Sequence, residues 1–139
     1  MGRILAIDYG VKRTGIAVTD ILQIIATGLT TIRTADVLDF LNTYVGQEDV
    51  DRIVVGFPKQ MNGEQSDNAK NVLTFVKQLK AKLPQIPVEY YDERFTSVLA
   101  HQTMLESGLH KKKRQNKALV DKISATIILQ SYLESKALQ

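Results

Sequence analysis

The stretch RILAIDYGVKRTGIAVT, residues 3–19, decides the fold of this chain. Its first six residues are almost all apolar and end on Asp8, which is typical of a central strand covered on both faces. Residues 9–13, with the conformational freedom of Gly10, predict a turn that reverses the chain. Residues 14–19 then form the returning strand. We therefore predict a β-hairpin that carries an acid at the end of its first strand.

Strands and helices continue through the middle of the chain. We expect a weaker third strand over about residues 26–32, and Thr34 as the N-cap of a helix whose apolar residues start at Val37. Residues 52–57 predict a fourth strand, which Pro58 ends. After a polar loop, a second helix is expected, with apolar positions at Val72, Leu73, Phe75, Val76 and Leu79.

The C-terminal part adds one strand and two helices. Residues 88–92 predict a fifth strand, and Thr96 or Ser97 caps a helix that ends near Gly108. A final helix over about residues 116–134 is expected to carry an apolar face formed by Leu119, Ile123, Ile127 and Leu133. This order predicts an α/β fold, a five-stranded mixed sheet flanked by helices, with an antiparallel hairpin side and a parallel βαβ side.

Length and composition narrow the class of protein. The 139 residues suit a single domain, residues 1–139, because two smaller domains would each bury too little surface. The absence of cysteine excludes a disulfide framework, a thiolate zinc site and a cysteine nucleophile. No run approaches the roughly 18 apolar residues of a membrane span, and the chain starts without a signal-peptide pattern. We expect a cytoplasmic protein with no membrane partner.

Positive charge is concentrated in one segment, residues 111–122. It holds six basic residues and one acid, so its net charge of +5 exceeds the +3 of the whole chain and leaves −2 for the rest. A Lys run is often only a solvated loop, but such a block on a slightly acidic domain also suggests a polyanionic partner. The basic residues of this block are Lys111, Lys112, Lys113, Arg114, Lys117 and Lys122.

Acidic residues follow two of the predicted parallel strands. Asp8 ends the first strand, where a carboxylate is costly unless it is paired, metal-bound or used to cap the turn. Asp92 and Glu93 lie at the exit of the fifth strand. Because adjacent residues of a strand alternate, only one of the two can face the same side of the sheet as Asp8. Asp121 lies in the first turns of the last helix. If that helix crosses the sheet, three carboxylates converge at the edge where open α/β sheets keep their sites.

Three converging carboxylates suit a hard divalent cation such as Mg²⁺ or Mn²⁺, which also keeps water and phosphate oxygens as ligands. Such a site can activate water and offset charge on the leaving oxygen of a phosphodiester. Asp20 ends the second strand at the far edge of the sheet, and Glu48, Asp49 and Asp51 precede the fourth strand, so we exclude them. His101 and His110 have no clear partner.

Four segments give a more specific indication. They are AIDYGVKRTGIA (residues 6–17), VVGFP (54–58) with NG (62–63), DERFTS (92–97), and VDKISA (120–125) followed by IL (128–129). In order and spacing they resemble the YqgF proteins, also called RuvX, the RuvC-like Holliday junction resolvases. The resemblance spans nearly the whole chain.

The resemblance implies a ribonuclease H-like fold and a cytoplasmic nuclease of ribosome biogenesis that acts at the 5′ end of pre-16S rRNA. Resolution of branched DNA junctions is the older alternative. Carried over residue by residue, the family's acids fall on Asp8, Glu93 and Asp121, which selects Glu93 over Asp92. Gly10, Lys12 and Arg13 fall on the hairpin turn beside the site. The expected nucleic-acid contacts are Lys12, Arg13, Lys111, Lys112, Lys113, Arg114 and Lys117.

One departure from the wider superfamily leaves the metal geometry open. Many ribonuclease H-like nucleases carry a catalytic acid at the end of the fourth strand, whereas here that strand ends with residues 56–58, Gly-Phe-Pro. The second carboxylate must then come from the fifth strand. The number of bound metal ions stays open.

Other functions fit the sequence less well. An Asp-x-Gly hairpin also begins the sugar-kinase and actin-like fold, but that architecture needs two lobes and the chain supplies one. A non-catalytic RNA-binding module would gain nothing from carboxylates that face phosphates. Junction resolution would require a symmetric dimer with two sites, and no dimer face is evident, so a homodimer stays open.

Overall fold

A five-stranded mixed sheet organises the described part of the computed structural model, residues 2–57, 68–92 and 117–137. The strands lie in the order β3-β2-β1-β4-β5. The pairs β1/β2 and β2/β3 are antiparallel, whereas β1/β4 and β4/β5 are parallel. The predicted hairpin side and βαβ side are therefore confirmed. The strand bounds are Arg3–Asp8 (β1), Arg13–Thr19 (β2), Ala26–Arg33 (β3), Val50–Phe57 (β4) and Val88–Asp92 (β5).

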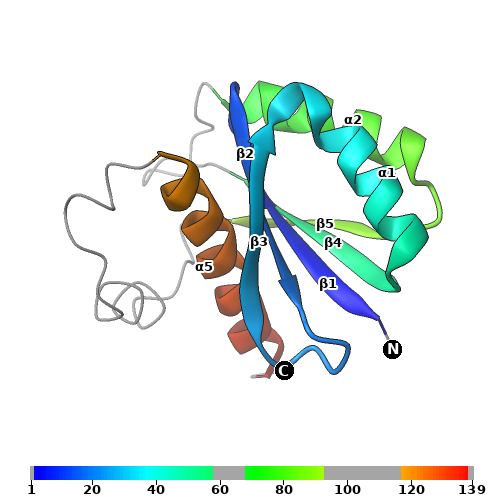
Figure 1. Ribbon diagram of the computed structural model, residues 1–139, viewed down its shortest axis with the longest axis vertical. Coiled ribbons are helices and arrows are strands. Elements are labelled where there is room, and N and C mark those ends of the chain that lie inside the picture. The colour runs from blue at the N-terminus through cyan, green and yellow to red at the C-terminus, as the bar shows by residue number, and fades with distance from the viewer. Residues whose placement is uncertain (1, 58–67, 93–116, 138–139) are drawn as a thin grey trace.

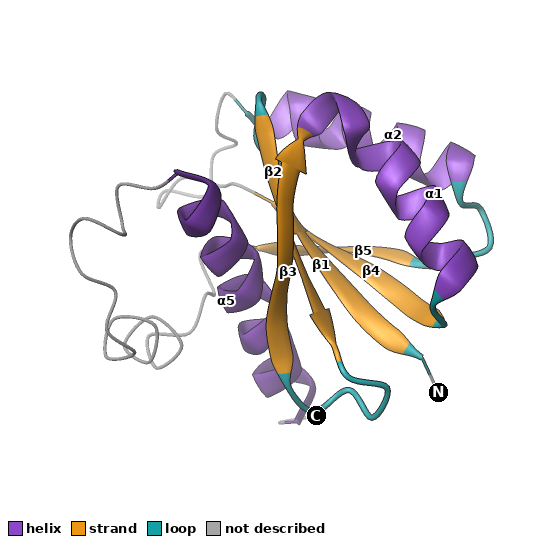
Figure 2. Cartoon of the chain, in the orientation of Figure 1, coloured by secondary structure: helices purple, strands orange, loops and turns teal. Residues whose placement is uncertain are grey.

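Helices cover both faces of this sheet (Figures 1 and 2). A short 3-10 turn, η1 (Thr34–Asp36), leads from β3 into α1 (Val37–Gln47), and α2 (Ala69–Lys82) connects β4 to β5. Both helices lie on one face, and α5 (Lys117–Ala137) crosses the other. The sheet is thus the middle layer of three. The helix predicted between residues 97 and 108 lies outside the described residues.

Strand alternation divides the core into two layers. On β1, Leu5 and Ile7 are fully buried in the cluster that includes α1 and α2. Ile4 and Ala6 point the other way, into the cluster formed with α5. This explains why β1 is nearly continuously apolar: it is central and both of its faces are covered.

The buried stripe of α5 differs from the prediction. Its core residues are Ala125, Ile128, Leu129 and Tyr132, in addition to Ile127. Of the predicted face, Ile123 and Leu133 are only half-buried, and the side chain of Leu119 lies outside the described residues. The predicted positions are mostly four residues apart, and steps of four drift by about 40° each around a helix of 3.6 residues per turn.

Two smaller predictions on the other face also need correction. Leu73 was expected among the apolar positions of α2, but it is 40% exposed, because the buried stripe runs through Val72, Val76 and Leu79. Thr34 does not cap a helix with its side chain. Its hydroxyl instead holds the β1–β2 turn, as described below.

Candidate active site

Asp8 lies at the carboxyl end of the central strand, on the face that α5 covers. It is half-buried and pairs with Gly15 of β2 in the antiparallel register. Alternation along β1 places it on the same side as Ile4 and Ala6, whose partners include α5 residues. The acid that ends β1 is therefore directed toward the helix that carries Asp121.

Gly15 lets α5 approach the sheet at this point. A Cβ atom at Gly15 would lie 2.0 Å from the backbone oxygen of Asp121, a distance that no side chain could tolerate. Asp8 and Gly15 are directly opposed, and opposed residues of antiparallel strands have Cα atoms about 4.5–5.5 Å apart. Asp8 and Asp121 therefore flank the same glycine. The structure brings together two of the three predicted acids.

Asp121 forms an ion pair with Arg13, the first residue of β2. The Nε of Arg13 donates to Oδ2 of Asp121 at 2.9 Å, across 108 positions of sequence. The two side chains are 38% and 24% exposed, so solvent screens the pair and its contribution to stability is small, about 0–1 kcal/mol. Arg13 was predicted to contact nucleic acid, and the structure shows that its Nε orients an acid of the candidate site.

The register of β5 separates Asp92 from the site. Asp92 pairs with Phe57 and Tyr91 with Gly56. Phe57 belongs to the cluster beneath α1 and α2, whereas Tyr91 packs in the α5 cluster. Because paired residues of neighbouring strands point to the same side, Asp92 faces away from Asp8.

Several predicted site residues fall outside the described ranges. Glu93, Lys111, Lys112, Lys113 and Arg114 are among them, and Lys117 is placed only as the first backbone position of α5. Within residues 2–57, 68–92 and 117–137, no three acidic, histidine or cysteine side chains form a metal-binding group. The predicted triad needs Glu93, so the described residues supply two of its three members.

Thr34 and Asn68 hold the turn beside Asp8, and neither was singled out for this role from the sequence. The Thr34 hydroxyl donates to the Gly10 carbonyl at 2.5 Å and accepts from Thr14 at 2.9 Å. The Thr34 amide also donates to the carbonyl of Lys12 at 3.0 Å. Asn68, just before α2, donates to the carbonyl of Tyr9 at 3.3 Å. The turn is thereby fixed to the starts of two helices.

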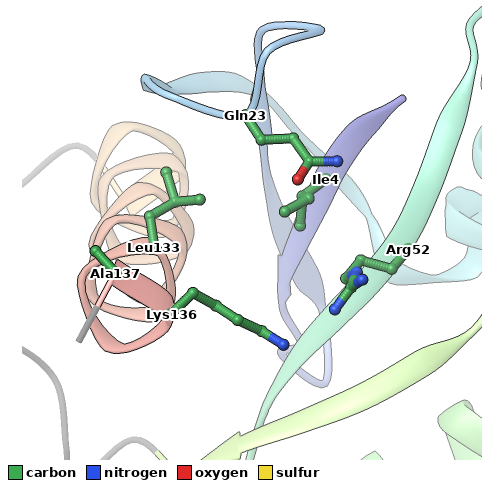
Figure 3. Close-up of a pocket in the computed structure, with 6 residues that line it drawn as sticks. All are labelled: Ile4, Gln23, Arg52, Leu133, Lys136 and Ala137. Atoms are coloured by element: carbon green, nitrogen blue, oxygen red, sulfur yellow. The ribbon is translucent and has the colours of Figure 1, made fainter. Parts of the chain in front are cut away.

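A separate pocket of about 310 Å³ opens at the opposite edge of the sheet (Figure 3). It is lined by Ile4, Gln23, Arg52, Leu133, Lys136 and Ala137, none of which was predicted to be functional.

Beside this pocket, the Tyr132 hydroxyl donates to Glu89 Oε2 at 2.5 Å and accepts from Arg52 at 3.0 Å. Burial, and then the hydrogen bond to Glu89, raise the pKa of Tyr132. This network links α5 to β4 and β5, and we interpret it as structural.

Comparison with known proteins identifies the family. A sequence model of the family described as "RuvX: Holliday junction resolvase" matches residues 2–135. The chain belongs to the RuvX family. A Bacteroides fragilis protein is 70% identical over 138 residues, which cover 99% of this chain and 100% of the relative. A Flavobacterium johnsoniae protein of this family is 58% identical over 136 residues, covering 98% and 99%. Both relatives carry the name "Putative pre-16S rRNA nuclease".

Solved structures support the fold of this RuvX chain. RuvC of T. thermophilus, in complex with a Holliday junction substrate, matches with a TM-score of 0.53 and 16% identity, over 97% of this chain and 96% of RuvC. A second Thermus thermophilus RuvC structure matches with a TM-score of 0.52 and 15% identity, over 96% of each chain. The predicted ribonuclease H-like fold is confirmed. None of the helices in the described ranges is long and apolar enough to cross a membrane.

Proposed function

We propose that this RuvX protein is a divalent-metal-dependent nuclease that hydrolyses phosphodiester bonds in the 5′ region of pre-16S rRNA. The observation that carries the proposal is the convergence of Asp8 and Asp121 on either side of Gly15. The names of relatives up to 70% identical over almost their whole length support the substrate class. We also propose that residues 1–139 form one domain and that the protein acts in the cytoplasm.

The donor set fits Mg²⁺ or Mn²⁺. Both described acids offer hard carboxylate oxygens, which these cations prefer, at an edge that stays partly open to solvent. Asp8, Asp121 and Glu93 would hold the ion. Asp92 faces the opposite side of the sheet, so Glu93 is the acid after β5 that would complete the set. The bound cation would supply activation of a water molecule and stabilisation of charge on the leaving oxygen.

Basic and polar residues of the chain would position the acids and bind the nucleic acid. The hydrogen bond from Arg13 Nε restrains the side chain of Asp121, and it limits the number of rotamers that the carboxylate adopts before it binds the metal ion. Lys12 lies on the turn that the hydrogen bonds of Thr34 restrain, and there it would contact a phosphate of the bound nucleic acid. The basic residues Lys111 to Arg114 and Lys117 would hold the polyanion by charge, independent of its sequence.

The direct test is cleavage of parallel substrates in Mg²⁺ or Mn²⁺. Labelled pre-16S rRNA 5′ segments, duplex DNA and a four-way DNA junction are incubated with the protein and with Asp8→Asn. We expect metal-dependent cleavage of the RNA and a loss of at least about 100-fold in Asp8→Asn with an unchanged thermal melt, because a metal site contributes several kcal/mol to the transition state. Near-normal turnover by folded Asp8→Asn would refute the metal assignment.

A matched pair of variants tests the third acid. Glu93→Gln should disable cleavage, whereas Asp92→Asn, on the opposite face of the sheet, should stay within a few-fold of the unmodified protein. The reverse order of effects would contradict the assignment.

Cleavage confined to the DNA junction would favour the alternative that the family description names, Holliday junction resolution. Binding of RNA without any cleavage would instead support a non-catalytic RNA-binding module.

A further inference from the structure

A cationic cavity of about 450 Å³ lies at the same edge of the sheet as Asp8. Its lining residues are Val11, Lys12, Arg13, Arg33 and Ala35, from the β1–β2 turn, the start of β2 and the junction between β3 and η1. Three of these five residues are basic and none is acidic. Arg33 was not among the predicted nucleic-acid contacts, and we call this cavity the Arg33 pocket.

The pocket holds two arginines in a position where their charges repel. Arg13 and Arg33 are directly opposed partners in the β2/β3 register, where like charges destabilise a sheet. Arg13 is partly compensated by Asp121. In the described ranges neither Arg33 nor Lys12 forms an ion pair. The pocket therefore carries uncompensated positive charge, which an anion would neutralise.

The backbone around the pocket is restrained before any ligand arrives. Thr34, the residue after Arg33, donates its amide to the carbonyl of Lys12 and its hydroxyl to the carbonyl of Gly10. These bonds fix the segment of Arg33 against the segment of Lys12. Val11, which is 67% exposed, adds an apolar surface at the rim that suits a ribose or a base.

The spacing relates the pocket to the candidate metal site. Strands about 4.8 Å apart, with a rise of about 3.3 Å per residue, place the Cα of Arg33 roughly 12 Å from the Cα of Asp8. A nucleic-acid strand carries one charge per about 3.4 Å of helix axis, so this distance corresponds to a few nucleotides.

We propose that the Arg33 pocket binds the phosphodiester backbone of the substrate strand a few nucleotides from the bond that is cut, with Arg33 and Lys12 as the phosphate contacts. The proposal rests on the proposed nuclease function for the identity of its ligand. Such contacts set the position of the strand over Asp8 and Asp121 without reading its sequence. They act on binding rather than on the chemical step.

The test is a salt series of binding, measured by fluorescence anisotropy of labelled single-stranded RNA in the presence of EDTA. We compare Arg33→Gln with the unmodified protein. Losing one phosphate contact should lower affinity about tenfold at low salt and should reduce the slope of log K against log salt by about 0.7. Arg33→Lys, which keeps the charge, should retain most of the slope.

Lys80→Gln is the matched control, because it removes one positive charge from an exposed position of α2, on the other face of the sheet. Its binding line should coincide with that of the unmodified protein. A thermal melt accompanies both variants, and Arg33→Gln should not lower the melting temperature, since it relieves the repulsion with Arg13. In cleavage assays Arg33→Gln should raise KM and leave kcat nearly unchanged.

The outcomes separate this proposal from the nuclease function. If the protein cleaves RNA and the Arg33→Gln line coincides with the Lys80→Gln line, the pocket proposal is wrong and the nuclease function stands. If the slope falls as expected but no substrate is cleaved, the pocket is supported and the nuclease function is wrong. Absence of any RNA binding by the unmodified protein would overturn both.

Discussion

Gly15→Ala is the substitution that tests most directly how the two acids are brought together. The added Cβ would lie 2.0 Å from the Asp121 oxygen, 2.4 Å from its carbonyl carbon and 3.0 Å from the Lys122 nitrogen. All three are backbone atoms, so no side-chain rotation can relieve the contact. Ordinary contact begins at 3.4 Å, and the start of α5 must therefore retreat by more than 1 Å.

Gly15→Ala should lower both the stability of the protein and its activity. Overpacking of a well-packed interface destabilises by about 1–3 kcal/mol, which a urea unfolding series measures as a lower midpoint with an unchanged slope. A displacement of about 1 Å in a catalytic group can reduce turnover about 100-fold. We therefore expect Gly15→Ala to remain folded, to bind Mn²⁺ more weakly in a calorimetric titration, and to lose most cleavage.

Gly46→Ala is the matched control for this experiment. Gly46 lies in the last turn of α1, and a Cβ there would meet nothing within 4 Å. The same chemical change should raise the free energy of unfolding by about 0.5–1 kcal/mol, because alanine loses less backbone entropy than glycine in a helix. If Gly15→Ala matches the unmodified protein in stability, Mn²⁺ affinity and turnover, α5 does not approach β2 as described.

Two further predictions concern parts of the fold away from the acids. Tyr132→Phe removes the hydroxyl that bonds Glu89 and Arg52, so urea unfolding should show a loss of about 1–3 kcal/mol while cleavage persists; an unchanged midpoint would contradict a structural role. Hydrogen bonds from the backbone amides of Ile25, with the larger effect, and Ile24 lower the pKa of Asp20 from its usual 3.8. Its contribution to stability is therefore present above pH 3.8 and is lost as the pH falls through the lower folded value. In Asp20→Asn the free energy of unfolding should fall less steeply as the pH is lowered through this range. Equal slopes in the variant and the unmodified protein would contradict the stabilising role of the Asp20 carboxylate.

The local pattern of the sequence was enough for the elements that position Asp8. The apolar run before Asp8 predicts a central strand, and the observed β1 has those bounds. The predicted fifth strand, residues 88–92, also agrees with β5. These predictions succeed because the period of side chains along a strand is a local property, written in consecutive residues.

The side of the sheet or helix that a residue faces, and the residues that it contacts, were decided by the tertiary structure. Strand alternation read from the sequence left both Asp92 and Glu93 possible at the exit of β5, and only the resemblance to the family selected Glu93. The pairing of Asp92 with Phe57 in the structure turns Asp92 away from Asp8. The buried stripe of α5 differed from the predicted one for the same reason, since the sheet selects which side of a largely apolar helix it covers. Local periodicity defines alternation, but the packing partner decides its phase.

The arrangement of the candidate site depends on pairs of residues that are distant in the sequence. The ion pair of Arg13 with Asp121 spans 108 positions, and the opposition of Arg13 and Arg33 follows from a register that includes a bulge. The residue types and the family motifs identified Asp8 and Asp121 as candidates. Only the folded sheet, with Gly15 open to the backbone of α5, decided that the two acids lie beside the same glycine. Such a close approach is a property of two packed elements, so neither segment of sequence contains it alone.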